Sequence, residues 1–422
     1  MSPRLPFLAI VVLVVTGAVL ASEGRDRADD TSAAEGRPTV IEPPGTTWFC
    51  AGGSATDESD PGAFADHTVV VAAGDRAVTG RLTVVPGDHA PPPTTDTSST
   101  TSIPTTTRPT SRREVERTFR VAAGDQARFR LGDLVHAPLA AAVVEIDPEP
   151  RTTLPPPTEG PDAPPDVTVA HEVRGPEGVD TAPCTSHSAS TWHFAWGATT
   201  RDAREQLVLF NPFPNDVAVD AVFSTDRGVR EPLRWQGLTV AAHSVVAVDV
   251  GEDVTRRGHV AATLQVRGGR LVVDRLQTFD GQLGSAGVSV AAGVPEAATR
   301  WTFADGEVTD GDAERIVLYN PGESVAETQV VLELADPDSA EGYRPEPFAV
   351  TVRPGRYEVL DLAQQPRVPK GKAHTITVRS TNGTPVVVER VTGTPDPAAG
   401  PGNPLRLDAD SPLPVPAPVP VP

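Results

Sequence analysis

The sequence predicts an all-β chain with three tandem antiparallel β-sandwich domains of the immunoglobulin-like kind, which follow an N-terminal signal or anchor helix. Three observations support this fold class. A block of roughly 110 residues recurs three times, apolar and polar residues alternate within each block, and Gly, Asn and Asp turn signals separate the alternating runs. No stretch after residue 30 keeps a helical period with helix caps.

The recurring block is clearest in the second half of the chain. LVLFNPFPND begins at Leu207 and IVLYNPGESV at Ile316, an offset of 109 residues, and the same offset separates WHF at Trp192 from WTF at Trp301. Two further pairs of segments follow in the same order: TVAAHSVVAVDV (239–250) with TVRPGRYEVLDL (351–362), and LVVDRLQTF (from 271) with VVVERVTGT (from 386). Four landmarks in one order indicate an internal duplication and not one motif used twice.

The N-terminal half contains a third, degraded copy of this block. WFC (48–50) stands in the place of WHF and WTF, and HTVVVAAGDRAV (from His67) replaces the Asn-Pro strand. Two insertions, 91–111 and 147–166, are rich in Pro, Thr and acidic residues and have few apolar ones. We expect these insertions to be disordered, because too little apolar surface is available to offset the entropy of ordering them.

The resulting organisation has six parts. After the N-terminal segment 1–22 and a linker 23–45, we expect copy 1 at 46–186, copy 2 at 190–296, copy 3 at 299–394 and a Pro-rich disordered tail at 395–422. The end of that tail, PLPVPAPVPVP, is typical of an extended polyproline segment.

The N-terminal segment predicts where the protein resides. After Arg4, an uncharged apolar run of 17 residues extends over 5–21, and polar residues follow it. Such a run is either a cleaved signal peptide or a retained membrane anchor. We therefore expect an extracytoplasmic protein, secreted or anchored to the cytoplasmic membrane by residues 5–21. The net charge of −20 argues against a nucleic-acid partner and against docking on anionic lipid, so membrane contact is expected only through this segment.

The residues that recur in the copies are predicted to be structural. Proline has no amide hydrogen, so Asn-Pro marks the end of a buried strand, where the Asn side chain can bond the turn backbone. The Trp and Phe residues are predicted core anchors, whereas a role in stacking on carbohydrate would need them to be exposed. These repeat anchors are Trp48, Trp192, Phe194, Asn211, Pro212, Trp301, Phe303, Asn320 and Pro321.

The two cysteines predict one disulfide. Cys50 lies on the first strand of copy 1, and Cys184 follows its last strand. The first and last strands of a sandwich can be neighbours, and an exported chain with two cysteines usually pairs them. The alternative is two free thiols, whereas two cysteines alone make a poor metal site.

No pattern predicts a catalytic, cofactor-binding or metal-binding residue. Ser54, Asp66 and His67 could form a Ser–His–Asp arrangement, but copies 2 and 3 do not keep these residues and no G-x-S-x-G elbow is present. His187 and His193 flank a Ser/Thr stretch that we interpret as a linker.

Acidic loops at 305–312 and 57–60 could hold calcium, although a solvated turn is the favoured interpretation. Asn382-Gly383-Thr384 matches a glycosylation acceptor but is first of all a hairpin turn.

The order W-x-[CF], LVLFNPFPND, VVDRLQ resembles an uncharacterised family of actinobacterial exported proteins that is catalogued only as a domain of unknown function. The similarity covers most of 48–394 and is clearest at 192–279. It implies an extracytoplasmic protein with an N-terminal hydrophobic segment, and it supplies no activity, substrate or catalytic residue. The first copy departs from the pattern, since its Asn-Pro is missing and long insertions interrupt it.

The predicted function is a non-catalytic, envelope-associated scaffold or protein-binding module without a cofactor, whose partners are envelope proteins or wall polymers. The alternative is a protein that binds carbohydrate or cell-wall polymers, which exposed Trp and Tyr side chains on one face would favour. A hydrolase is the third hypothesis, and a deep pocket with a carboxylate pair or a Ser–His contact would favour it.

Overall fold

A computed structural model describes residues 46–56, 65–89, 113–147, 167–176, 178–282, 284–334, 345–395 and 405–410. The predicted signal or anchor (1–22), the linker (23–45), the insertion 91–111, nearly all of the insertion 147–166 and most of the tail lie outside the described residues. The described residues between Pro43 and Val415 belong to one compact unit.

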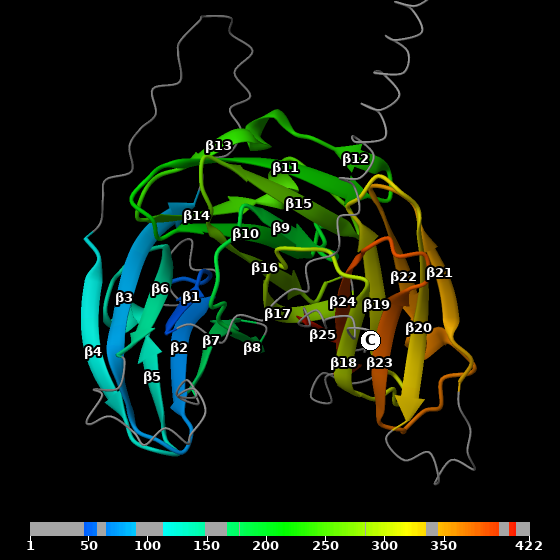
Figure 1. Ribbon diagram of the computed structural model, residues 1–422, viewed down its shortest axis with the longest axis horizontal. Helices are drawn as coiled ribbons and strands as arrows, with labels where there is room; N and C mark the ends of the chain where they lie inside the picture. The colour runs from blue at the N-terminus through cyan, green and yellow to red at the C-terminus, as the bar shows by residue number, and fades with distance from the viewer. Residues whose placement is uncertain are drawn as a thin grey trace, which may run out of the picture. The chain divides into compact units, whose positions relative to one another are not determined.

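The prediction of an all-β chain is confirmed (Figure 1). Helical structure in the described residues is limited to 3-10 segments of three residues: η2 (Leu131–Asp133), η3 (Leu233–Trp235), η4 (Val250–Glu252) and η5 (Leu362–Gln364). Within these ranges, no helix has the length and apolar character needed to span a bilayer.

The strands follow the three copies in chain order. Those of copy 1 are β1 (Thr47–Cys50), β2 (Asp66–Ala73), β3 (Val78–His89), β4 (Val115–Val121), β5 (Gln126–Arg130), β6 (Leu139–Ile146), β7 (Val167–Gly175) and β8 (Gly178–Pro183). Those of copy 2 are β9 (Thr191–Phe194), β10 (Ala203–Asn211), β11 (Val217–Thr225), β12 (Gly228–Arg230), β13 (Gln236–Val240), β14 (Ser244–Asp249), β15 (Val260–Arg267), β16 (Val272–Asp280) and β17 (Ser285–Ala292).

Copy 3 continues with the same kind of short strands. They are β18 (Arg300–Gly306), β19 (Ala313–Asn320), β20 (Ala326–Leu334), β21 (Phe348–Val352), β22 (Arg356–Asp361), β23 (His374–Ser380), β24 (Val387–Pro395) and β25 (Leu405–Asp410).

The three copies pair their strands in one common order, antiparallel throughout. One set of four strands is β1-β6-β3-β4, β9-β15-β11-β13 and β18-β23-β20-β21 in copies 1, 2 and 3. The other set is β5-β2-β7-β8, β14-β10-β16-β17 and β22-β19-β24-β25. The repeat detected in the sequence is therefore also a repeat of topology.

Two parallel contacts join strands of neighbouring copies into a twelve-stranded sheet. At the first, Val246 and Ala247 on β14 pair with Asp88 and His89 on β3. At the second, β17 pairs with β25. Within the tail that the sequence predicts to be disordered from residue 395, the structure describes the strand β25, which pairs with β24 as well. Its sequence LRLDAD alternates apolar and polar residues, and this strand signal was overlooked beside the high Pro content of the tail.

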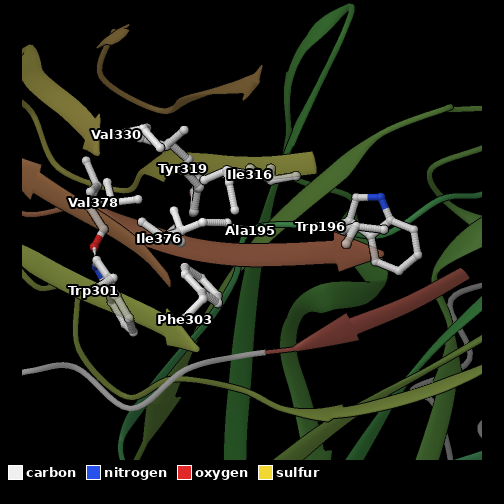
Figure 2. Close-up of a cluster of buried hydrophobic side chains, with 14 of the residues drawn as sticks. Ala195, Trp196, Trp301, Phe303, Ile316, Tyr319, Val330, Ile376 and Val378 are labelled. Atoms are coloured by element: carbon white, nitrogen blue, oxygen red, sulfur yellow. Dashed lines mark hydrogen bonds between the residues drawn. The ribbon is translucent and has the colours of Figure 1, made fainter. Parts of the chain in front are cut away.

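Each copy has a hydrophobic core built from both of its strand sets. In copy 1, Trp48 and Leu82 of one set pack with Val69 and Phe129 of the other. On β11, Val217, Val219, Ala221 and Phe223 are buried, in the period of two that the sequence predicts. The core of copy 3 also takes in Ala195 and Trp196 of copy 2, as Figure 2 shows. The third core therefore crosses a boundary between copies.

The predicted disulfide is confirmed. Cys50 at the end of β1 is bonded to Cys184, which follows β8. Both residues belong to the core of copy 1. The bond thus joins the first and last strands of this copy, whose connecting chain carries both predicted insertions.

Candidate functional site

The repeat-start tryptophans occupy equivalent buried positions. Trp192 and Trp301 are fully buried, and Trp48 is 7% exposed. The indole Nε1 of Trp192 donates to the Leu271 carbonyl at 3.0 Å, and that of Trp301 donates to the Val386 carbonyl at 2.8 Å. The two acceptors occupy matching places in the duplicated sequence. Phe194 and Phe303 are buried on the same strands.

The two Asn-Pro pairs end buried strands. Asn211 closes β10, and its Nδ2 donates to the carbonyl groups of Asn215 (2.8 Å) and Val240 (3.2 Å). Asn320 closes β19 and donates in the same way to Ser324 (2.7 Å) and Val352 (2.9 Å). Each Oδ1 accepts an amide two residues further on. The half-buried Pro212 and Pro321 follow directly. These bonds give both Asn side chains a role in the turn.

The residues considered for a Ser–His–Asp arrangement point to different partners. Asp66 accepts from Nε of Arg130 at 2.7 Å. The Nδ1 of His67 lies 3.0 Å from the Ala140 carbonyl. Ser54 Oγ accepts the amide of Ala65 at 3.3 Å.

His193 follows the Ser/Thr stretch that we interpret as a linker. This side chain is on β9, and its Nδ1 lies 2.9 Å from Thr263 Oγ1. Burial lowers the pKa of His193 to about 4. It lies directly after Trp192, inside the WHF landmark that the sequence predicts as the first strand of copy 2. His187 stacks on Trp192 at a ring separation of 6.0 Å.

A glycine five residues after each repeat-start Trp marks a buried polar centre. The sequences are WFCAGG, WHFAWG and WTFADG, and the glycines are Gly53, Gly197 and Gly306. A Cβ atom on Gly197 would lie 2.3 Å from the Glu205 carboxylate. On Gly53 it would lie 2.5 Å from His67, and on Gly306 2.6 Å from His374. Glycine is therefore required because a polar side chain packs directly on the backbone at this place.

The polar centre of copy 2 contains an ion pair with copy 3. Nη1 of Arg275 donates to Oε2 of Glu389 at 2.6 Å and also to the Trp196 carbonyl. Oε1 of Glu389 accepts the amide of Ala195 at 2.7 Å. Glu205 lies within this centre, where burial raises its pKa well above the ordinary value against the opposing charge of Arg275. We call this contact between copies 2 and 3 the second junction.

The polar centre of copy 1 has the same relation to copy 2. Oδ2 of Asp274 accepts the amide of Ala51 at 2.8 Å. His171 Nε2 lies 3.8 Å from the same oxygen, and His171 Nδ1 lies 3.2 Å from His67 Nε2. Ala51 and Ala195 are both the third residue after a repeat-start Trp. In this first junction, as in the second, a carboxylate of the following copy therefore caps one backbone amide of the preceding copy.

The polar centre of copy 3 is formed by contacts among residues of copy 3 itself. His374 Nε2 lies 2.9 Å from Oε2 of Glu314, and Arg390 approaches Glu314 to 4.0 Å. Burial lowers the pKa of His374, but the hydrogen bond and charge of Glu314 outweigh it, so this pKa is raised. Ala304, the counterpart of Ala51 and Ala195, is exposed. Copy 3 therefore shows no carboxylate of a further copy on the amide that corresponds to those of Ala51 and Ala195 among the described residues.

The ionisable side chains of these polar centres are largely withdrawn from solvent. Eight of these side chains are at most 2% exposed: His67, His171, Glu205, Asp274, Arg275, Glu314, His374 and Glu389. An open surface pocket of about 580 Å³ lies elsewhere. It is lined by Ser188, Ala189, Ser190, Thr191, Gly269, Arg270, Pro295 and Glu296.

The described part of the chain contains no group of three or more His, Cys, Asp or Glu side chains that could hold a metal ion. In the acidic loop 305–312, Asp310 pairs with Lys370 at 2.7 Å, and Asp312 accepts the amide of Thr309. The other acidic loop, 57–60, lies outside the described residues. Asn382 holds a turn, donating to the Val325 carbonyl at 2.8 Å.

The fold and these centres define an all-β protein built from repeated copies with buried polar junctions. The chain belongs to a family of unknown function, DUF5719, whose model matches residues 157–396, more than half of the chain. This confirms the resemblance to a family of unknown function, while the bacterial group stays a prediction. No curated protein matches the chain. It is similar to the crystal structure of Thermotoga maritima 1070 at 20% identity, with a TM-score of 0.24, over 29% of this chain and 98% of that chain.

Proposed function

We propose that this protein is an exported, envelope-associated and non-catalytic scaffold that binds other proteins through three tandem immunoglobulin-like β-sandwich domains. One observation carries this proposal. The ionisable groups suited to acid–base chemistry are buried. The carboxylates of Asp274 and Glu389 accept hydrogen bonds from backbone amides of the neighbouring copy.

Several features support three β-sandwich domains. Each copy pairs its strands in two antiparallel sets, and side chains from both sets form its core. Export would follow from the apolar run 5–21, and the disulfide suits an oxidising compartment.

The junctions support a scaffold because they fix neighbouring copies to each other. A hydrogen bond from a backbone amide to a buried carboxylate is directional. Breaking it costs free energy, because it leaves a charged group buried without a partner. Apolar residues of both copies surround the first of these contacts, including Val85 and Ala141 of copy 1 and Phe210 and Val272 of copy 2. A rigid spacing of binding surfaces is what a scaffold needs.

No specific observation favours either alternative function, the binding of carbohydrate or wall polymer or the hydrolysis of a substrate. All five tryptophans are buried, at 7% exposure or less: Trp48, Trp192, Trp196, Trp235 and Trp301. None of them offers a flat ring for stacking on a sugar. For a hydrolase, the paired acids Glu205 and Glu389 would have to meet a substrate, and both are 1% exposed.

Chemical cross-linking of the full chain in isolated cell envelopes, followed by mass spectrometry, tests the scaffold. We expect the same defined protein partner with the unaltered chain and with Glu145→Ala, and weaker cross-linking with Glu389→Ala, which loosens the second junction. Binding to purified wall polymer without protein would support the polymer-binding alternative. Hydrolysis of wall fragments that is lost on substitution of one acidic residue would overturn the proposal.

A further inference from the structure

A row of three buried side chains crosses the first junction. It begins at the Ala140 carbonyl, runs through His67 and His171 of copy 1, and ends at Asp274 of copy 2. The side chains of His171 and Asp274 are 1% and 2% exposed, so no bulk water reaches their contact. Every proton in this row therefore has to be accounted for by the residues themselves.

The hydrogen positions in the row follow from its first acceptor. A carbonyl only accepts, so Nδ1 of His67 carries the hydrogen bonded to Ala140. Burial lowers the pKa of His67 to about 4, so above that pH its ring is neutral and Nε2 presents a lone pair. Nδ1 of His171 then has to donate to this lone pair across 3.2 Å. A neutral His171 consequently turns the lone pair of Nε2 toward Asp274.

An ionised Asp274 would be poorly placed beside that lone pair. Among the described residues, the Nε2 atom of His171 makes no hydrogen bond, and the Gly52 backbone is another polar group that faces this ring. The groups that face the Asp274 carboxylate are the amides of Ala51 and Gly52 and the ring of His171, with His67 behind it. At the same junction, Asp180 of β8 accepts the amide of Val290 at 2.6 Å.

The second junction differs in one respect. Glu389 takes the matching amide but pairs with Arg275, which keeps its positive charge in proteins. In the first junction, the side chain opposite the carboxylate is His171, whose charge depends on a proton.

We propose that the buried pair of His171 and Asp274, whose Nε2 and Oδ2 atoms lie 3.8 Å apart, holds one proton and that this proton keeps the first junction closed. With this proton present, the buried negative charge of Asp274 is neutralised, either by the proton on its carboxyl or by the imidazolium formed on His171. When it is lost, a lone pair faces a buried carboxylate and the junction loosens. The second junction needs no such proton.

The direction of the pH dependence follows from the burial of Asp274. Burial raises the pKa of Asp274 from 3.8 to about 7, against the opposing amides of Ala51 and Gly52. Because this pKa is raised in the closed junction, the protonated Asp274 contributes its full stabilisation of the junction below about pH 4. This contribution is lost as the pH rises to about 7. The lowered pKa values of His67 and His171 act in the opposite direction, so the Asp274 contribution must be isolated by a variant.

Asp274→Asn isolates this contribution. Its Oδ1 can accept the Ala51 amide, and its uncharged amide group stands in for the protonated carboxyl, so the variant does not titrate at this position. Hydrogen exchange of the Ala51 amide reports opening of the first junction. We expect the protection of this amide in the unaltered protein, divided by that in the variant, to fall about tenfold per pH unit between about pH 5 and pH 7 and to be constant above. A ratio that is constant from pH 5 to pH 8 would overturn the proposal.

The Ala195 amide is the control in the same two proteins, because it is held by Glu389 beside Arg275. Its protection ratio between the proteins should not change with pH. If the Ala195 amide is not protected from exchange in Asp274→Asn, the variant has not folded. The proposal is then tested by carboxyl-carbon NMR, which measures the titration of Asp274 in the unaltered protein. A titration midpoint near pH 7 supports the bound proton, and a midpoint below about pH 5 rejects it.

Discussion

Arg275 and Glu389 form an ion pair across the second junction, with 2.6 Å between Nη1 and Oε2. The two side chains are 0% and 1% exposed. Arg275 also lies 5.0 Å from the ring centroid of Trp196, so an aromatic face covers its charge. Removing one partner of such a pair leaves the other charge buried and unpaired, whereas pairs at the surface are compensated by water.

Glu389→Ala should therefore destabilise the protein by about 3–5 kcal/mol. It leaves the buried Arg275 guanidinium without its charge partner and the Ala195 amide without its acceptor. The matched control is Glu145→Ala, which removes one of the two surface partners of Arg81, at 3.4 Å, and should cost less than about 1 kcal/mol. Urea unfolding of both variants provides the measurement. Equal losses in the two variants would show that the second junction contributes no more than a surface pair.

Gly197→Ala should destabilise copy 2 by about 1–3 kcal/mol, since its Cβ would collide with the Glu205 carboxylate. Gly258→Ala is the control, because a Cβ there meets nothing within 4 Å. This second change should be neutral or should stabilise by up to about 1 kcal/mol. Thermal unfolding compares the two. A tolerated Gly197→Ala would contradict the close packing of the polar centre on the backbone.

Asn211→Ala and Asn320→Ala should cost similar amounts, about 1–3 kcal/mol each, because each leaves the same buried turn carbonyls without a donor. The exposed Asn215 contributes only its backbone carbonyl to the first of these turns, so Asn215→Ala should change stability by less than about 0.5 kcal/mol. Chemical denaturation measures all three. A large effect at only one of Asn211 and Asn320 would argue against equivalent roles.

Replacing both Cys50 and Cys184 by Ser should destabilise copy 1 by up to about 5 kcal/mol in the chain-entropy model, given a sequence separation of 134 residues. Hydrogen exchange resolves where the loss falls. Amides that exchange by local opening should exchange faster in β1 and β6, and amides that exchange only by global unfolding, including those around Trp301, should exchange faster in all three copies. Acceleration confined to copy 1 would show that this copy unfolds independently of the other two.

The sequence was informative wherever the signal is local. The 109-residue offset between Trp192 and Trp301 predicted two equivalent buried indoles, and alternation of apolar residues predicted the strands. Asn-Pro predicted strand ends because proline lacks a ladder donor. These features need only the chain within one copy.

The polar junctions depend on how the copies pack, which single-copy patterns do not reveal. A signal was nevertheless present: the aligned segments place Asp274-Arg275 beside Glu389-Arg390, and Glu205 beside Glu314. Charged residues within a strand are usually assigned to its solvent face, so these were not weighed as buried. In copy 1, the corresponding centre contains His67 and His171, and this change of residue type hid the equivalence.

Differential scanning calorimetry of the full chain tests most directly whether the junctions hold the three copies together as one scaffold. We predict one cooperative unfolding transition whose calorimetric and van't Hoff enthalpies agree, and a separate, earlier transition when Glu389→Ala uncouples copy 3. Three independent transitions in the unaltered protein, unchanged by Glu389→Ala, would contradict this account.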